Sequence, residues 1–322
     1  MKIDELDLPD STIDFLKSQG FEKLYPPQVD SVKSGLLDGK SILVSAPTAS
    51  GKTLIAMLAM FSYLSKNNGK VVYLSPLRAL AAEKFTEFKK LEKIALGKKI
   101  KVGISTGDFD GIEKNLEKSD ILILTNEKMD SVIRHGVEWI DEIGLVISDE
   151  VHLIGDENRG PTLEMILTQL KLLDSKPQIV GLSATITNSD EIANWLDCKL
   201  VKNDWRPVPL SEGVCDGGEV TMNDGNIFDV ERSLRGTPID LGVQSVKQGG
   251  QSLVFAETRT RSKSLATKAA DVIFQMLKKN ELKELEKTSK KILSQNENTE
   301  IVKTLAILVK KGVAFHHAGL NQ

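Results

Sequence analysis

The stretch Ser41–Thr53, with the sequence SILVSAPTASGKT, constrains the fold more than any other part of the chain. Residues 42–45 form a short apolar run typical of a buried strand, and the apolar run 54–60 is typical of a helix. A loop of small residues lies between them and ends in Gly-Lys-Thr. A helix N-terminus leaves backbone N–H groups unpaired and carries partial positive charge, so it attracts phosphate. This order of elements predicts a phosphate-binding loop.

The residues of the predicted loop suit that chemistry. Ala49 and Ser50 belong to the loop that would surround the phosphates, and Gly51 lets the backbone approach them closely. Lys52 would reach the β- and γ-phosphates of a nucleotide, and the Thr53 hydroxyl would bind Mg²⁺. The alternative is an ordinary strand–turn–helix in which Lys52 is only solvated. The strand before the loop and the helix after it favour the phosphate-loop interpretation.

Composition limits the class of protein. The chain has 322 residues, which is enough for two domains of ~150 residues each, and its formal net charge is −3. That charge argues weakly against nucleic acid as a partner, although a basic groove can lie on an acidic protein. The two cysteines, Cys198 and Cys215, stand apart, so neither a zinc site nor a cysteine-ligated cluster is expected and a reducing cytoplasm fits. We expect no signal peptide, membrane span or membrane partner.

Polar motifs follow a series of short apolar runs that we predict to be strands. These runs are residues 70–75, 101–105, 120–124, 145–148 and 179–182. The polar motifs are Pro76–Leu80, Thr106–Asp108, Thr125–Glu127, Asp149–His152 and Ser183–Thr185. Because helical patterns separate most of the runs, the sequence predicts a doubly wound α/β domain with a parallel sheet. Ligands of such sheets bind at the carboxyl ends of the strands, where all these motifs lie.

The pair Asp149-Glu150 is the second informative motif. An Asp at the end of an apolar strand is costly unless it binds something. Beside a phosphate loop, Asp149 can hold Mg²⁺ through its waters and Glu150 can orient the attacking water. The alternative is a strand-end capping carboxylate followed by an exposed acid. His152, taken alone, fits a structural histidine better than a catalytic one.

An aromatic and proline-rich segment precedes the loop. Two prolines open a predicted helix over residues 27–37 and fix Gln28, whose amide could present a donor and an acceptor to adenine. Phe21 or Tyr25 could pack on the base. Taken alone, the segment fits a turn with core aromatics better.

Further helices are predicted from periodicity and capping signals. Ser11 is expected to cap a helix through Ser18, and Asn188 with Glu191 to cap a helix through Leu196. The other predicted helices are residues 76–94, 261–279, 281–293 and 299–310.

The second part of the chain follows a proline-containing linker over residues 202–210. Asp-Gly pairs at 216–217 and 224–225 predict tight turns, consistent with a hairpin. Residues 251–256 and 313–315 are predicted to be further strands, the first of them buried. We expect two domains, at residues 1–206 and 207–322.

Together these motifs resemble superfamily 2 helicases of the Ski type, and among them archaeal Hjm-type repair helicases, which are similar to the helicase part of DNA polymerase theta. Ala46, where the phosphate-loop pattern usually has Gly, is normal for that family. The matching stretches span nearly the whole chain in the family's order: 21–28, 46–53, 76–80, 103–108, 125–130, 149–152, 181–185, 205–210, 253–259 and 315–320.

The resemblance implies an ATP-driven, 3′-to-5′ DNA helicase that acts at single-strand/duplex junctions of stalled forks. It implies a RecA-like first domain in which Gln28 reads adenine, with Phe21 beside it, and in which Lys52, Asp149 and Glu150 act in hydrolysis. Mg²⁺ would lie at Thr53 and Asp149. Coupling between ATP and domain movement would involve His152, Ser183 and Thr185. The backbone of single-stranded DNA would be contacted by Arg78, Thr106, Gly107, Thr125, Thr258 and Arg259.

Without the family context, local interpretations of the DNA-contact residues would be preferred. Arg78 would be a solvated helix start, Thr106 and Thr125 would be caps, and Arg259 would form a surface salt bridge. The resemblance also predicts that the chain is an amino-terminal fragment with an incomplete second RecA-like domain. It would then lack the arginines that complete the ATP site, hydrolyse ATP very slowly and unwind no duplex.

Two alternatives stay open. An RNA helicase of the same family would use the same backbone contacts, although details such as Pro-Leu-Arg-Ala-Leu favour DNA. A nucleotide-binding scaffold without turnover is disfavoured by the intact Asp149-Glu150 pair. We expect a monomer.

Overall fold

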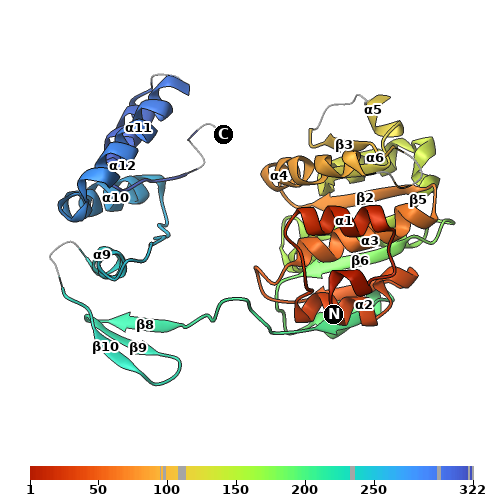
Figure 1. The fold of residues 1–322 in the computed structure, drawn as a ribbon, viewed down its shortest axis with the longest axis horizontal. Coiled ribbons are helices and arrows are strands. Elements are labelled where there is room, and N and C mark those ends of the chain that lie inside the picture. Colours follow the sequence, from red (N-terminus) through yellow and green to blue (C-terminus); the bar gives the residue numbers. More distant parts are fainter. Residues whose placement is uncertain are drawn as a thin grey trace. The chain divides into compact units, whose positions relative to one another are not determined.

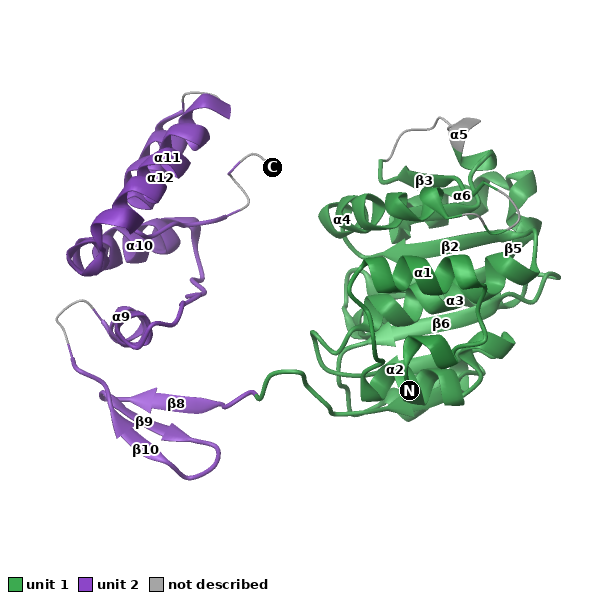
Figure 2. Cartoon of the chain, viewed as in Figure 1, with its two compact units in different colours: residues 1–209 green, residues 210–322 purple. Residues whose placement is uncertain are grey.

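The computed structural model describes residues 1–94, 96, 99–107, 114–232, 236–295, 299–317 and 320. It divides into two compact units, residues 1–209 and 210–322, shown in different colours in Figure 2. The division falls just beyond the expected boundary at residue 206. Three residues of the motifs quoted above, Asp108, Ala318 and Gly319, lie outside the described residues.

The first unit is built on a parallel sheet of seven strands in the order β3-β4-β2-β5-β6-β1-β7. Its strands are β1 (Ile42–Ser45), β2 (Lys70–Ser75), β3 (Val102–Ser105), β4 (Ile121–Thr125), β5 (Ile143–Ser148), β6 (Gln178–Ser183) and β7 (Lys199–Lys202). The predicted α/β fold class, a RecA-like parallel sheet with flanking helices, is confirmed. β7 was not predicted, because it is short, begins and ends in lysine, and only Val201 in it is buried.

Helices cover both faces of this sheet (Figure 1). They are α1 (Asp10–Ser18), α2 (Pro26–Lys33), α3 (Lys52–Lys66), α4 (Arg78–Phe88), α5 (Lys114–Glu117), α6 (Asn126–His135), α7 (Gly160–Lys171) and α8 (Ser189–Trp195). Short 3₁₀ helices are η1 (Ile3–Glu5), η2 (Leu36–Asp38), η3 (Lys89–Lys93), η4 (Glu138–Glu142) and η5 (Val151–Gly155). Helices α1, α3 and α4 pack in one apolar core, and α6, α7 and α8 pack in a second.

Alternation along the strands explains the two cores. In β2, Val71 and Tyr73 belong to the core under α3, whereas Val72 and Leu74 belong to the core under α7. Successive side chains of a strand point to opposite faces, so a strand buried on both sides reads as a continuous apolar run. That pattern is what made the central strands predictable.

The register aligns the polar strand ends. Ser45 of β1 is level with Ser183 of β6, and Ser75 of β2 is level with Thr125 of β4. Asp149 follows β5 directly, and its backbone N–H donates to the Leu74 carbonyl of β2 at 3.0 Å. The predicted polar motifs therefore meet at one edge of the sheet.

Several predicted helix boundaries were wrong. Helix α1 begins at Asp10, so Ser11 lies inside it and not at its cap. The predicted bounds of α8 are confirmed, with Asn188 at its N-cap and Leu196 at its C-cap, but the Asn188 side chain makes no capping hydrogen bond. The helix predicted over residues 27–37 ends at Lys33, because Gly35 takes a left-handed conformation with φ of 98°. The helix predicted over residues 76–94 is α4 followed by η3.

The described part of the second unit holds a small antiparallel sheet and four α-helices. Strands β8 (Gly213–Asp216), β9 (Glu219–Met222) and β10 (Ile227–Asp229) pair in sequence through the two predicted turns, so the expected hairpin is confirmed. The helices are α9 (Thr237–Lys247), α10 (Arg259–Ile273), α11 (Lys279–Gln295) and α12 (Glu300–Lys310), with η6 (Phe274–Met276) after α10. A small core joins α10 and α12 through Ala266, Ala270 and Leu308.

The two strands predicted at 251–256 and 313–315 were wrong. Both segments are irregular, and the side chains of Leu253 and Phe255 are 80% and 89% exposed. A strand needs a neighbour to pair its backbone groups. Among the described residues after Pro209, the strands pair only within the β8–β10 sheet, so an apolar run alone does not become a strand there.

Candidate nucleotide site

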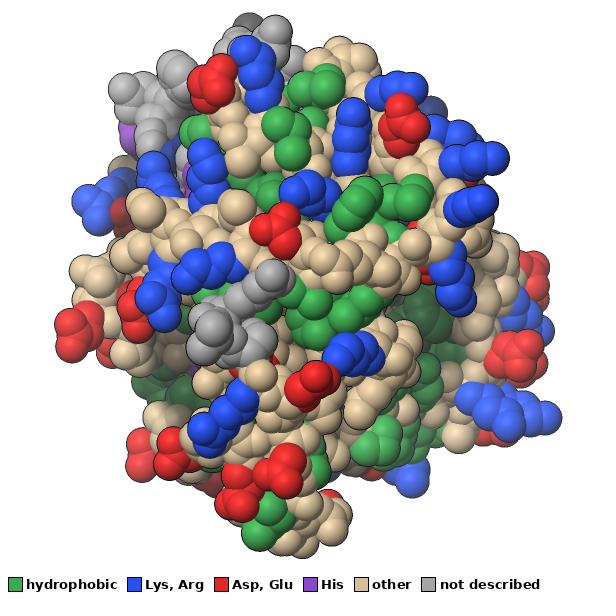
Figure 3. All heavy atoms as spheres, turned by 90° about the vertical axis from the view of Figure 1, so that its left-hand side faces the viewer, with side chains coloured by type: hydrophobic (Ala, Val, Ile, Leu, Met, Phe, Trp, Pro, Cys, Tyr) green, Lys and Arg blue, Asp and Glu red, His purple; other side chains and the backbone are tan. Residues whose placement is uncertain are grey.

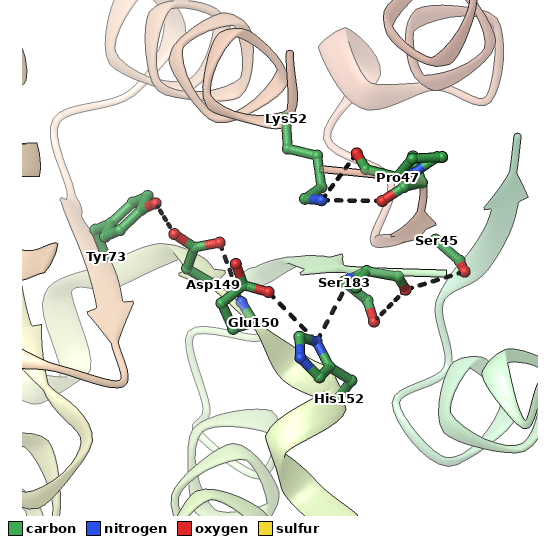
Figure 4. Close-up of polar contacts among 10 residues, drawn as sticks. Ser45, Pro47, Lys52, Tyr73, Asp149, Glu150, His152 and Ser183 are labelled. Carbon is green, nitrogen blue, oxygen red and sulfur yellow. Dashed lines mark hydrogen bonds and ion pairs between the residues drawn. The ribbon is translucent and has the colours of Figure 1, made fainter. Parts of the chain in front are cut away.

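The phosphate loop joins β1 to α3. Gly51 takes a left-handed φ of 84° immediately before α3 begins at Lys52. The Lys52 ammonium turns back into the loop and donates to the backbone carbonyls of Ala46 at 2.9 Å and Pro47 at 3.2 Å (Figure 4). The loop thus holds its lysine at the N-terminus of a fifteen-residue helix, where backbone donors and positive charge face the same space.

Glycine is favoured at position 51 for two reasons. Its positive φ is unfavourable for other residues, and a Cβ atom there would lie 2.2 Å from the Gln28 side-chain nitrogen. Ala49, in the same loop, has a φ of 66° despite its Cβ. Such conformations cost of order 1 kcal/mol and concentrate at functional sites.

A carboxylate pair faces the lysine from the end of β5. Asp149 Oδ2 accepts from the Tyr73 hydroxyl at 2.6 Å, and Asp149 Oδ1 accepts from the backbone N–H of Glu150 at 3.0 Å. Figure 4 shows Lys52 on the side of the site opposite Asp149 and Glu150. Glu150 also has a left-handed φ, of 51°, which is a second strained residue in the site.

Burial and charge act against each other on these groups. Partial burial lowers the pKa of Lys52, and the negative charges of Glu150 and Asp149 partly oppose that effect. Burial, followed by the charge of Asp149, raises the pKa of Tyr73 well above its usual value. Tyr73 is therefore a neutral donor that holds Asp149 in one orientation.

His152 connects the carboxylate pair to the end of β6. Its Nδ1 lies 3.3 Å from Glu150 Oε2 and 3.4 Å from the Ala184 backbone nitrogen. The two contacts are alternatives, because Nδ1 donates only when protonated and accepts only when deprotonated. The Ser183 and Ser45 hydroxyls both donate to the Ala184 carbonyl, at 2.9 and 3.4 Å.

Thr53 has a contact that the sequence did not indicate. Its hydroxyl oxygen accepts from the Lys84 ammonium of α4 at 2.9 Å, and the same ammonium lies 3.0 Å from Glu87. The Thr53 hydroxyl and the Glu87 carboxylate beside the same ammonium carry hard oxygen atoms of the kind Mg²⁺ prefers as ligands. Because a cation already lies at Thr53, the site accommodates positive charge, and its residues fit the expected metal.

Gln28 links the proline-rich turn to the loop. Its side-chain Nε2 donates to the Gly51 carbonyl at 3.1 Å, and its Oε1 accepts from the Tyr25 backbone N–H at 2.7 Å. Phe21 packs against the core instead of standing free, whereas Tyr25 is exposed and packs on Trp205 with ring centroids 4.5 Å apart. The amide keeps one donor and one acceptor beyond these two bonds.

Comparison with known proteins decides the family. The sequence pattern of the family described as DEAD/DEAH box helicase matches residues 25–192, which is more than half of the chain. The chain belongs to the DEAD/DEAH box helicases. The match covers the loop, the carboxylate pair and β6, the elements that form the site.

This helicase chain is also similar to curated archaeal proteins. The ATP-dependent DNA helicase Hel308 of Thermococcus kodakarensis is 43% identical over all of the chain, which covers 27% of that protein. The proteins of the same name from Methanocella arvoryzae and Pyrococcus horikoshii are 43% and 42% identical, again over the whole chain and over 43% of each relative. The chain thus spans less than half the length of these relatives. The resemblance to Ski-type superfamily 2 helicases is confirmed.

The residues predicted to contact nucleic acid fall into two groups. Arg78 begins α4 and is exposed, and Thr106 and Gly107 follow β3, all at the carboxyl edge of the sheet. Thr125 is buried, and its hydroxyl accepts from the Lys128 backbone N–H as the N-cap of α6. The capping role that local interpretation gave to Thr125 is therefore present in the structure. These four residues belong to the first unit.

Thr258 and Arg259 lie in the second unit, at the start of α10. Thr258 caps that helix by accepting from the Arg261 backbone N–H at 3.1 Å, and Arg259 is exposed.

Thr185, predicted to act in coupling, is exposed after β6. Figure 3 shows basic and acidic side chains interspersed over the face it presents.

No cluster of three or more His, Cys, Asp or Glu side chains capable of holding a metal occurs among the described residues. Within the same ranges, no helix has the length and apolar character needed to cross a membrane.

Sequence reasoning missed Tyr73 and Lys84. Tyr73 carried a weak signal, because a buried phenol inside an apolar strand needs a polar partner. Lys84 carried none, since its contact with Thr53 joins residues from two helices.

Proposed function

We propose that the protein is an ATP-dependent DNA helicase whose first unit binds and hydrolyses ATP. The observation that carries the proposal is the meeting of Lys52 and the Asp149-Glu150 pair at the carboxyl edge of one parallel sheet. Phosphoryl transfer needs mainly positioning and neutralisation of charge, and these groups supply both. The printed names of the similar archaeal proteins, ATP-dependent DNA helicases, support the choice of DNA.

In hydrolysis, Lys52 would leave the Ala46 and Pro47 carbonyls and bind the β- and γ-phosphates. Thr53 and Asp149 would hold Mg²⁺, which when bound neutralises phosphate charge. Glu150 would orient and polarise the water that attacks the γ-phosphorus. Tyr73 would keep Asp149 in place through its 2.6 Å hydrogen bond.

Recognition of adenine would involve Gln28. Its unused donor and acceptor match the N7 and amino group of an adenine edge, while its other two bonds keep it beside the loop. Phe21 would act through the packing of this turn, and Tyr25 is the exposed aromatic side chain available to a base.

Single-stranded DNA would be bound through its backbone by Arg78, Thr106, Gly107 and Thr125 of the first unit and by Thr258 and Arg259 of the second. Contacts of this kind fix position without reading sequence. We propose 3′-to-5′ movement on forked DNA. His152, Ser183 and Thr185 would couple the ATP state to that movement, since the His152 ring lies between Glu150 and the β6 end.

For the 322 residues taken alone, we propose ATP binding with very slow hydrolysis and no unwinding. The proposal rests on the family's need for arginines from a second RecA-like domain, a contribution worth ~10³–10⁵ in rate. The apolar segment 251–256 is exposed and irregular, which supports an incomplete second domain. We also propose that the protein is cytoplasmic and monomeric.

Steady-state phosphate release by the 322-residue chain, with and without single-stranded DNA, tests this proposal. We expect slow release that Glu150→Gln lowers further, little stimulation by DNA, and no strand displacement. Rapid turnover that depends on DNA and is lost in Glu150→Gln would show that these residues need no further arginines. Hydrolysis unaffected by Glu150→Gln would remove the assigned role of that carboxylate.

A further inference from the structure

Lys84 is a cation at the residue that would bind the metal. Its ammonium donates to Thr53 Oγ1 at 2.9 Å, and only 12% of its side chain is exposed. This lysine comes from α4, six residues after Arg78, and it belongs to none of the motifs that define the ATP site. The contact therefore adds a second helix to the metal end of the site.

Two carboxylates lie beside the same ammonium. Glu87 Oε2 is 3.0 Å from Lys84 Nζ, and Glu83 Oε1 is 3.9 Å away. The charge of Glu87 also contributes to raising the pKa of Tyr73, the residue that holds Asp149. Lys84 thus bridges Thr53 and Glu87, so it keeps a partner if it gives up Thr53.

Thr53 cannot favourably serve both cations. Coordination of Mg²⁺ by the Thr53 hydroxyl would place a divalent ion next to the oxygen that now accepts from Lys84. Charges of equal sign at such separations repel strongly where water is partly excluded. The Glu87 carboxylate, which the ammonium already contacts at 3.0 Å, can hold it after it has moved away from Thr53 and so relieve this repulsion.

We propose that Lys84 is a positioning residue that holds the Thr53 hydroxyl in the nucleotide-free protein, competes with Mg²⁺ for it, and gives up Thr53 while keeping Glu87 when the metal–nucleotide complex binds. The proposal rests on the ATP site proposed above. Lys84 then sets how strongly ATP binding depends on Mg²⁺.

Calorimetric titration of the 322-residue chain with ATP, in excess Mg²⁺ and in EDTA, tests the proposal. The quantity compared between variants is the ATP affinity in excess Mg²⁺ divided by the ATP affinity in EDTA. Lys84→Met keeps the apolar stem and removes the charge, so the ratio should rise roughly threefold to tenfold over wild type. A ratio that is unchanged or lower in Lys84→Met overturns the proposal.

Two control variants separate charge from packing. Lys84→Arg keeps the charge and should keep the wild-type ratio. Lys89→Met removes a lysine that pairs with Glu92 at the same i, i+3 spacing just after α4, and it should also leave the ratio unchanged. Thermal melting of each variant reports folding separately. A shift of the ratio in Lys89→Met equal to that in Lys84→Met would make the effect nonspecific and the proposal wrong.

Glu87→Gln tests the withdrawal step. Without the carboxylate, Lys84 stays on Thr53, so the ratio should fall below wild type. In the Lys84→Met background the same change should have a smaller effect, because no ammonium is left to withdraw. An equal effect in both backgrounds would mean that Glu87 acts on the metal directly, and the withdrawal step would be wrong.

Failure of the proposed function gives a different result. If wild type bound no ATP in either buffer, the ATP site itself would be refuted, and the role of Lys84 with it. If wild type bound ATP and Lys52→Ala did not, while Lys84→Met kept the wild-type ratio, only the role of Lys84 would be refuted.

Discussion

At the scale of single residues, two residues of the site have a backbone conformation that is unfavourable for residues other than glycine. Ala49 and Glu150 both have positive φ, with values of 66° and 51°, although neither is glycine. Backbone strain of this kind persists only where the surrounding structure enforces it. The loop and the carboxylate pair are therefore places where stability and function compete.

Ala49→Gly should stabilise the protein by up to about 1 kcal/mol, because glycine adopts a left-handed φ without a Cβ clash. Ala46→Gly is the matched control: Ala46 is buried and has no positive φ, so its replacement should destabilise by about 1 kcal/mol. Urea denaturation measures both changes. A loss of stability in Ala49→Gly as large as that in Ala46→Gly would contradict the assignment of strain to residue 49.

The lowered pKa of Lys52 predicts a pH dependence. Only the charged amine attracts phosphate, and burial makes Lys52 lose its proton below the ordinary lysine pKa of 10.5. ATP affinity should therefore begin to fall, as pH rises, before 10.5 is reached. Titrations across the alkaline range, with circular dichroism to confirm folding, measure this. Constant affinity up to pH 10.5 in a folded protein would be inconsistent with a buried Lys52.

The residues that could be predicted from sequence are those whose motifs are local. Lys52 and Thr53 follow a strand and open a helix, and Asp149 ends an apolar run, so each was recognisable from its neighbours. Tyr73 and Lys84 act through contacts between separate elements, which no spacing along the chain records. Their roles became visible only with the register of β2 beside β5 and with the packing of α4.

At the scale of elements, burial decides which predictions succeeded. The central strands read as apolar runs because helices cover both faces of the sheet. The edge strand β7 reads as polar and was missed. The apolar runs at 251–256 and 313–315 failed because a strand also depends on pairing partners, which the run itself does not specify.

The first turn of α2 is joined to the phosphate loop by one side chain. Gln28→Ala removes its bonds to Gly51 and Tyr25, so the free energy of unfolding should fall by about 1–3 kcal/mol. If Gln28 also reads adenine, the preference for ATP over GTP should fall as well. Urea denaturation and nucleotide titrations measure the two effects. Gln19→Ala, an exposed control, should change neither, and unchanged ATP preference in Gln28→Ala would rule out base recognition by that residue.

At the scale of the whole molecule, DNA binding should rely on phosphates. Fluorescence anisotropy with single-stranded DNA should show affinity that falls with salt and varies little with sequence. Arg78→Ala should weaken binding to all sequences alike, whereas Arg134→Ala, an exposed arginine paired with Asp130 on α6, serves as a control with little expected effect. Strong base preference, or equal affinity in Arg78→Ala, would contradict the proposed interface, and RNA of the same sequence tests the choice of DNA.

The central claim is that the first unit binds ATP through Lys52, and calorimetric titration of the 322-residue chain with ATP and Mg²⁺ tests it most directly. Lys52→Ala removes the charge that would face the phosphates and should lower ATP affinity by roughly tenfold or more, since one charge-assisted contact contributes about 1.5–3 kcal/mol. Lys66→Ala removes a half-exposed lysine from the opposite end of α3 and should leave the affinity unchanged. Equal affinity of wild type and a folded Lys52→Ala protein would contradict the account.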